Sequence, residues 1–91
     1  MSNSYIWERI AQVAKPNRIR GMVTWTFWES RETPGTYMAT RTDAYMEQPW
    51  AYRRDPEKDV QNYTDHAAMV EGYKLMVDTH GCDVIEPLTG C

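Results

Sequence analysis

Four side chains in the sequence could bind a soft metal ion: His66, His80, Cys82 and Cys91. His66 and His80 lie at the two ends of one predicted helix, about 21 Å apart at a rise of 1.5 Å per residue, so one ion cannot bind both. His80, Cys82 and Cys91 would supply three ligands, but the paired Cys-x-x-Cys spacing of structural zinc sites is absent. We therefore expect no metal and no other cofactor, with His80 beside the negative end of the helix dipole.

The sequence contains no recognisable catalytic constellation. A nucleophilic Ser, Cys or Thr needs a neighbouring base that a third group orients, and adjacent helical residues such as Asp65 and His66 do not face each other. Glycine-framed serine and phosphate-loop motifs are absent. Glu29, Glu32 and Asp43 flank a predicted hairpin, where we interpret them as solvated charges. We expect a protein that is not an enzyme.

The sequence has more residues suited to protein binding than to catalysis. Trp, Tyr and Arg are the types enriched at interface hot spots. Several of them lie outside the regular apolar stripes, and we predict a protein-binding surface formed by Trp28, Trp50, Tyr52, Arg53 and Arg54. The acidic side chains of the next segment would form its rim: Asp55, Glu57 and Asp59. The partner would be another protein or a second copy of the chain. The competing interpretation is that Trp28 and Trp50 cover the second face of a sheet against a helix.

The alternative function is nucleotide or single-stranded nucleic-acid binding. Arginines are interleaved with aromatic residues along the N-terminal half, as the stacking of bases over a basic groove requires; the candidates are Arg18, Arg20, Arg31 and Arg41. Residues 1–54 carry a net charge of +3 and residues 55–91 a net charge of −6. The whole chain is acidic, at −3, whereas nucleic-acid binders are usually basic.

Composition predicts one folded domain spanning residues 1–91. Leu, Ile, Val and Phe contribute only 13 of 91 residues, but six Met, four Trp and six Tyr can replace them in a core. No apolar run approaches the roughly 20 residues of a membrane span. Charged residues near the N-terminus occupy the place of a signal peptide's apolar stretch. We expect a cytoplasmic protein, with Cys82 and Cys91 reduced.

The first half of the chain predicts a helix followed by a β-hairpin. Residues 4–14 have apolar side chains at helical spacing and end before Pro16, which predicts a short helix. Residues 19–29 and 36–45 are rich in strand-forming types. Thr33-Pro34-Gly35-Thr36 between them is a turn sequence, with Pro and Gly at its two central positions.

The second half predicts a helix followed by a short strand. Residues 50–52 could form an edge strand. Residues 64–80 then predict a helix that begins at an N-cap, Thr64, and ends before Gly81; its buried stripe would be Met69, Tyr73, Met76 and Val77. Residues 82–86 predict the last strand. The expected class is α+β, in the order helix, hairpin of two to three antiparallel strands, helix, short strand.

Residues 63–73, Tyr-Thr-Asp-His-Ala-Ala-Met-Val-Glu-Gly-Tyr, follow the hairpin segment 32–43. Together they resemble a pattern in small uncharacterised proteins of tailed bacteriophages, where a tyrosine leads into an Ala-rich helix with a Gly-His pair nine residues later. Gly72 keeps this spacing, and Tyr73 replaces the histidine. The resemblance covers about a third of the chain and implies a phage setting, in the bacterial host cytoplasm. The expected role is a non-enzymatic accessory protein, either an assembly component or an inhibitor that occludes a host or defence protein.

Overall fold

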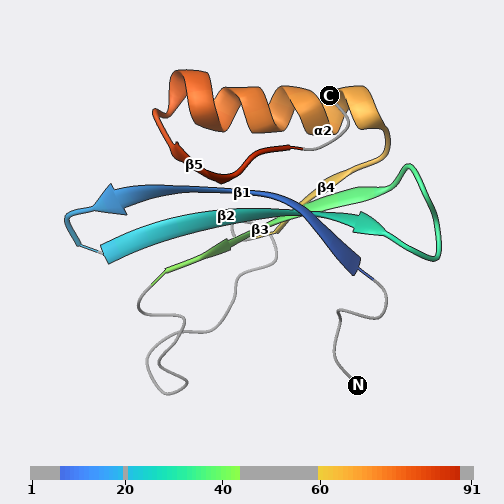
Figure 1. The fold of residues 1–91 in the computed structure, drawn as a ribbon, viewed down its shortest axis with the longest axis horizontal. Coiled ribbons are helices and arrows are strands. Elements are labelled where there is room, and N and C mark those ends of the chain that lie inside the picture. Colours follow the sequence, from blue (N-terminus) through green and yellow to red (C-terminus); the bar gives the residue numbers. More distant parts are fainter. Residues whose placement is uncertain (1–6, 20, 44–59, 89–91) are drawn as a thin grey trace, which may run out of the picture.

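The computed structural model describes residues 7–19, 21–43 and 60–88, which form a five-stranded antiparallel sheet with one helix on one face (Figure 1). The strands are β1 (Trp7–Asn17), β2 (Gly21–Ser30), β3 (Tyr37–Thr42), β4 (Val60–Tyr63) and β5 (Asp83–Glu86). They are ordered β4-β3-β2-β1-β5 across the sheet. The helix consists of α2 (His66–Lys74) and a π-helical continuation, η2 (Leu75–Thr79). The predicted α+β class is confirmed.

The helix predicted over residues 4–14 is wrong, because β1 occupies Trp7–Asn17. This strand pairs with β2 along almost its whole length, and the register shifts between Arg9 and Ala11. The extra residue, Ile10, breaks the alternation of core and solvent positions. Ile10 and Val13 therefore fall at a spacing that resembles a helix turn in the sequence.

Pro16 lies within β1 instead of ending a helix. It pairs with Met22 close to the hairpin turn, beyond the residues of β1 that pair with β5. Because β1 is locally an edge of the described sheet there, the missing N–H of proline costs none of the described sheet hydrogen bonds on that side. Asn17 begins the turn that follows, since its side-chain oxygen accepts a hydrogen bond from the Ile19 amide at 2.9 Å.

The β2–β3 hairpin is confirmed. Phe27 lies opposite Ala39 in the register of the two strands. In the turn, the Thr36 amide donates to the Thr33 carbonyl at 3.1 Å. Gly35 has a φ of 92°, a value that side-chain-bearing residues rarely adopt, so Pro34-Gly35 occupies the central positions of a type II turn.

The C-terminal helix is confirmed with a corrected start. Its N-cap is Asp65 rather than Thr64, because the Asp65 carboxylate accepts a hydrogen bond from the Ala68 amide at 2.7 Å. Gly81, with a φ of 70°, ends the helix as expected. The Cys82 amide then donates to the Met76 carbonyl at 3.0 Å, and the chain continues into β5, the predicted last strand.

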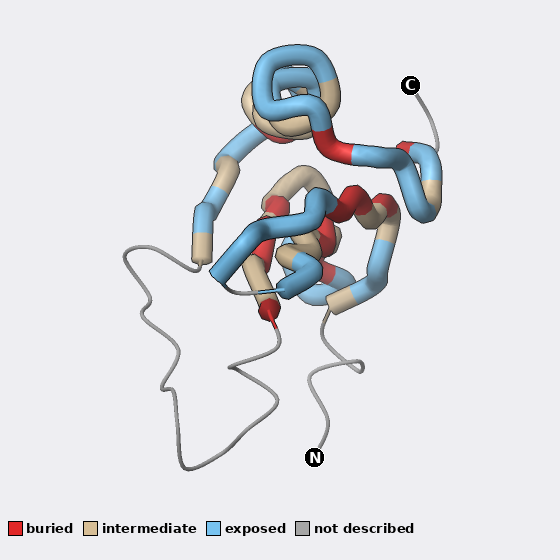
Figure 2. The backbone as a smooth tube through the Cα atoms, turned by 90° about the vertical axis from the view of Figure 1, so that its left-hand side faces the viewer, coloured by how far each residue is buried: buried red, intermediate tan, exposed pale blue. Residues whose placement is uncertain are grey.

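The core lies between the sheet and the helix, which stands on one side of the sheet in Figure 2. Phe27 and Met69 are its largest fully buried side chains. The Tyr73 ring meets the Phe27 ring edge to face, with centroids 5.8 Å apart. Met69 is buried, and the rest of the predicted helix stripe is partly buried against the core: Tyr73, Met76 and Val77. Aromatic rings and methionines therefore share the core with Val13, Leu88 and two alanines, Ala11 and Ala39.

Some predicted features lie outside the described residues, namely the edge strand at 50–52 and the residues before Trp7. Strand β4 was not predicted at all. The described part of the chain has no helix long and apolar enough to cross a membrane.

Candidate functional site

Of the predicted protein-binding surface, Trp28 is the member that the structure describes; Trp50, Tyr52, Arg53 and Arg54 lie outside the described residues, as does the acidic rim at 55–59. Trp28 is half-buried on the sheet face opposite Phe27 and the helix. Its indole N–H donates to the Thr40 hydroxyl at 2.9 Å. The described helix covers the other face of the sheet, so it does not cover Trp28. The five-residue surface stays a prediction.

The arginines of the alternative function are spread along the sheet. Arg18 precedes β2 and Arg31 follows it, so the length of a ten-residue strand separates them, roughly 30 Å. Arg41 lies on β3 opposite Trp25, and Arg20 is outside the described residues. The structure does not gather Arg18 and Arg31 into one groove.

Candidate catalytic and metal-binding groups are also dispersed. Within the described ranges, no group of three His, Cys, Asp or Glu side chains is arranged to hold a metal ion. Glu29 lies opposite Tyr37 at one end of the hairpin, whereas Asp43 follows β3 at the other end. Asp43 is 3% exposed, so its interpretation as a solvated charge is wrong. Cys91 is outside the described residues, and its pairing with Cys82 is untested.

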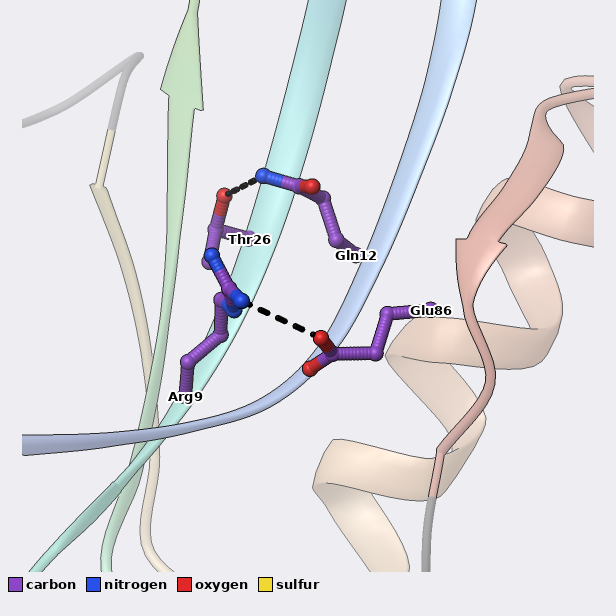
Figure 3. A network of polar contacts seen from close by, with 4 residues as sticks. All are labelled: Arg9, Gln12, Thr26 and Glu86. Atoms are coloured by element: carbon purple, nitrogen blue, oxygen red, sulfur yellow. Dashed lines mark hydrogen bonds and ion pairs between the residues drawn. The ribbon is translucent and has the colours of Figure 1, made fainter.

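The two edges of the described sheet differ in regularity. Strand β5 exposes Val84 and Ile85, but its pairing with β1 is irregular between Val84 and Glu86. Glu86 is tied back to β1 by an ion pair with Arg9 at 3.2 Å, beside the Gln12–Thr26 hydrogen bond (Figure 3). A short, bulged and charged edge is a common protection against strand addition.

Strand β4 forms the other edge of the described sheet and is regular. All four of its residues pair with β3, from Val60 opposite Thr40 to Tyr63 opposite Tyr37. The helix runs beside it, and the two elements border a groove of about 720 Å³. We call this hollow the β4 groove; the lining residues that matter below are Gln61, Tyr63, Glu71, Gly72, Lys74, Leu75 and Asp78.

The close contact of Tyr63 with Gly72 shapes the β4 groove. A Cβ atom added to Gly72 would overlap the Tyr63 hydroxyl oxygen and come within 2.8 Å of its Cζ. The absence of a side chain at Gly72 therefore lets the tyrosine ring lie directly against the helix. Burial against the helix raises the pKa of the Tyr63 phenol above its ordinary value. The nine-residue spacing of Tyr63 and Gly72 noted in the sequence thus has a structural reason in this chain.

A second hollow lies on the other side of the helix, over the sheet. It has a volume of about 410 Å³ and is lined by residues of β1, β2, β3 and the end of the helix. We call it the Trp25 pocket. Two lining side chains are cationic, Lys15 and Arg41, and its other lining groups include Met76 and Cys82. Burial raises the pKa of the Cys82 thiol; the nearby Lys15 ammonium opposes that rise and the Asp83 carboxylate adds to it.

Sequence reasoning missed both hollows. The sequence around Gln61 and Tyr63 does not show the alternation that predicts a strand. The position of Lys15 beside the Trp25 pocket depends on β1, most of which was predicted as a helix. The Tyr-Gly spacing was the available signal for the β4 groove. Comparisons with protein-family models, with characterised proteins and with solved structures found no match for the chain.

Proposed function

We propose that the chain is a non-enzymatic protein-binding domain that takes an extended segment of a partner protein into the β4 groove. The observation that carries this proposal is the position of a large groove between an edge strand and a helix. In one common mode of peptide recognition, a peptide adds a strand to a sheet edge, and neighbouring pockets take its alternate side chains. Such binding needs no catalytic group.

Backbone hydrogen bonds would supply part of the affinity. Each residue of an edge strand directs its N–H and C=O either to its paired neighbour or outward. Because β4 pairs with β3 without irregularity, its outward groups are evenly placed for an added strand. The bulged pairing of β5 makes that edge less suitable.

The groove walls indicate the chemistry of the partner segment. Leu75 is 50% exposed and lines the groove with the Tyr63 ring, so an apolar side chain is expected there. Glu71 and Asp78 are exposed acidic residues of the same lining, against one cation, Lys74. We therefore expect an extended segment with an apolar anchor and a flanking Lys or Arg.

A role as an accessory factor follows from this chemistry. A domain that only captures an extended segment can hold an assembly together or occlude a partner's own contact. The phage setting implied by the sequence resemblance is compatible with either role and stays a proposal.

The test is a selection of peptide ligands followed by affinity measurements on variants. Peptides from a random ten-residue display library would be selected on the full chain, synthesised and measured by calorimetry. Complete burial of an aliphatic side chain contributes about 1.5–3 kcal/mol, and Leu75 is half exposed. Leu75→Ala should therefore weaken binding by about fourfold to tenfold.

Matched controls distinguish the β4 groove from other surfaces. Ile85→Ala removes a side chain of similar exposure, 60%, from the β5 edge and should leave the affinity unchanged. Peptides with N-methylated backbone amides should bind much more weakly, because strand addition needs those donors. Peptides that bind the Leu75→Ala chain with full affinity, or a selection that yields no binder, would contradict the proposal.

A further inference from the structure

The Trp25 pocket combines cations with an aromatic wall. Lys15 lies opposite Val23 on one pair of strands, and Trp25 lies opposite Arg41 on the next. Alternate residues of a strand share a face, so Lys15, Val23, Trp25 and Arg41 all stand on the helix-facing side of the sheet. Trp25 is thus positioned between two cationic residues on neighbouring strands.

The roof of the pocket is formed at the end of the helix. Met76 belongs to the last helical turn, His80 is the residue that directly follows the helix, and Cys82 is the buried residue beyond Gly81. The pocket volume of about 410 Å³ falls within the range of small-molecule sites, roughly 300–1,000 Å³. An indole, a thioether and a thiol next to cations are suited to a ligand with a flat apolar body and a charged group.

Two acidic residues stand next to lining residues in the chain: Asp83, whose charge contributes to the raised pKa of the Cys82 thiol, and Asp43, which is buried two residues after Arg41. None of the described lining residues is acidic. Asp83 pairs with Ala14 of β1. Val13 and Lys15, on either side of Ala14, lie on the helix-facing side of the sheet, so Ala14 and its partner Asp83 lie on the opposite face. The C-terminal end of a helix carries roughly half a negative charge, and here the amides of His80 and Cys82 cap carbonyls of the last turn.

We infer that the Trp25 pocket binds a small organic anion that carries a flat ring. The ring lies against Trp25 under Met76, and the anionic group is directed toward Lys15 and Arg41. A guanidinium has five N–H donors, so Arg41 can donate hydrogen bonds to a ligand and to a neighbouring group of the protein at the same time. This site is separate from the β4 groove, and its ligand is independent of the proposed peptide partner.

The test uses three probes of related structure on the full chain. Naphthalene-1-sulfonate has the ring and the charge, naphthalene-1-methanol has the ring without the charge, and methanesulfonate has the charge without the ring. Calorimetry should give the highest affinity for naphthalene-1-sulfonate, and that affinity should fall as salt screens the charges. NMR shift changes should centre on the indole N–H of Trp25 and the methyl group of Met76.

Variants separate this site from general apolar binding. Lys15→Gln removes an exposed cation and should weaken the sulfonate by up to about fivefold, as for a solvent-exposed ion pair, without changing the neutral probe. Trp25→Leu should weaken both ring-bearing probes. Arg18→Gln is the matched control, because it removes an exposed cation outside the described pocket lining, and it should change nothing. Equal affinities for the charged and neutral naphthalenes, no binding at millimolar concentrations, or full sulfonate affinity in the Lys15→Gln chain would overturn the inference.

Discussion

Replacement of Gly72 by Ala tests the packing that shapes the β4 groove. In an ordinary helix interior this change is stabilising, because alanine is favoured over glycine by about 1 kcal/mol. In this chain the new Cβ would come within 2.8 Å of Tyr63 Cζ and 3.1 Å of Cε1. Both atoms belong to a ring on a short edge strand, so the ring would have to lift away from the helix.

The cost of that displacement can be estimated from buried area. An aromatic side chain buries roughly 150–250 Å², and losing about half of it at 25 cal/mol per Å² costs about 2–3 kcal/mol. Against the gain of about 1 kcal/mol in helix propensity, Gly72→Ala should lower the free energy of unfolding by about 1–2 kcal/mol. The measurement is urea unfolding followed by circular dichroism.

The sign of the effect should reverse when the ring is absent. In a Tyr63→Val background the strand keeps a β-branched residue, and Gly72→Ala should then stabilise by about 1 kcal/mol. Ala67→Gly, at an exposed position of the same helix, measures how much more alanine stabilises this helix than glycine does. A Gly72→Ala chain that is more stable than the wild type, or an equal effect in both backgrounds, would refute the contact between Tyr63 and Gly72.

Two further predictions concern the helix start and alkaline pH. Asp65→Ala removes the acceptor of the Ala68 amide and should cost about 1 kcal/mol of stability in urea unfolding, whereas Asp65→Asn should retain most of it. Burial and the carboxylate of Glu29, which accepts the hydrogen bond of the Tyr37 hydroxyl, raise the pKa of Tyr37 above 10.0. The unfolded state therefore loses this proton first, so the free energy of unfolding should fall as pH rises above about 10. Tyr37→Phe should flatten that decline between pH 9 and 11, and an unchanged slope would contradict the assignment.

Local signals were sufficient for the elements that the sequence predicted correctly. The β2–β3 hairpin depends on Pro34-Gly35, whose backbone preferences define the turn wherever the strands lie. The helix depends on the stripe that begins at Met69 and on the glycine at its end, Gly81. Both signals lie within a few residues of the structure they specify.

The missed elements depend on contacts between distant residues. Strand β1 was hidden by the irregularity at Ile10, and its strand identity comes from pairing with β2 and β5. Strand β4 has only four residues, with exposed Gln61 and Asn62 at its centre. The β4 groove and the Trp25 pocket could not be predicted, because each combines residues of elements whose register the sequence does not reveal.

The most direct measurement of the central claim is NMR shift mapping of a selected peptide on the full, isotope-labelled chain. The proposed function predicts that the largest backbone changes fall on the edge strand, Val60–Tyr63, and on the groove residues Glu71 and Leu75. The amides of Asp83–Glu86 and the indole N–H of Trp28 should change little. Changes centred on Trp28 would instead support the aromatic surface predicted from the sequence, and together with an unperturbed β4 they would contradict the β4 groove as the binding site.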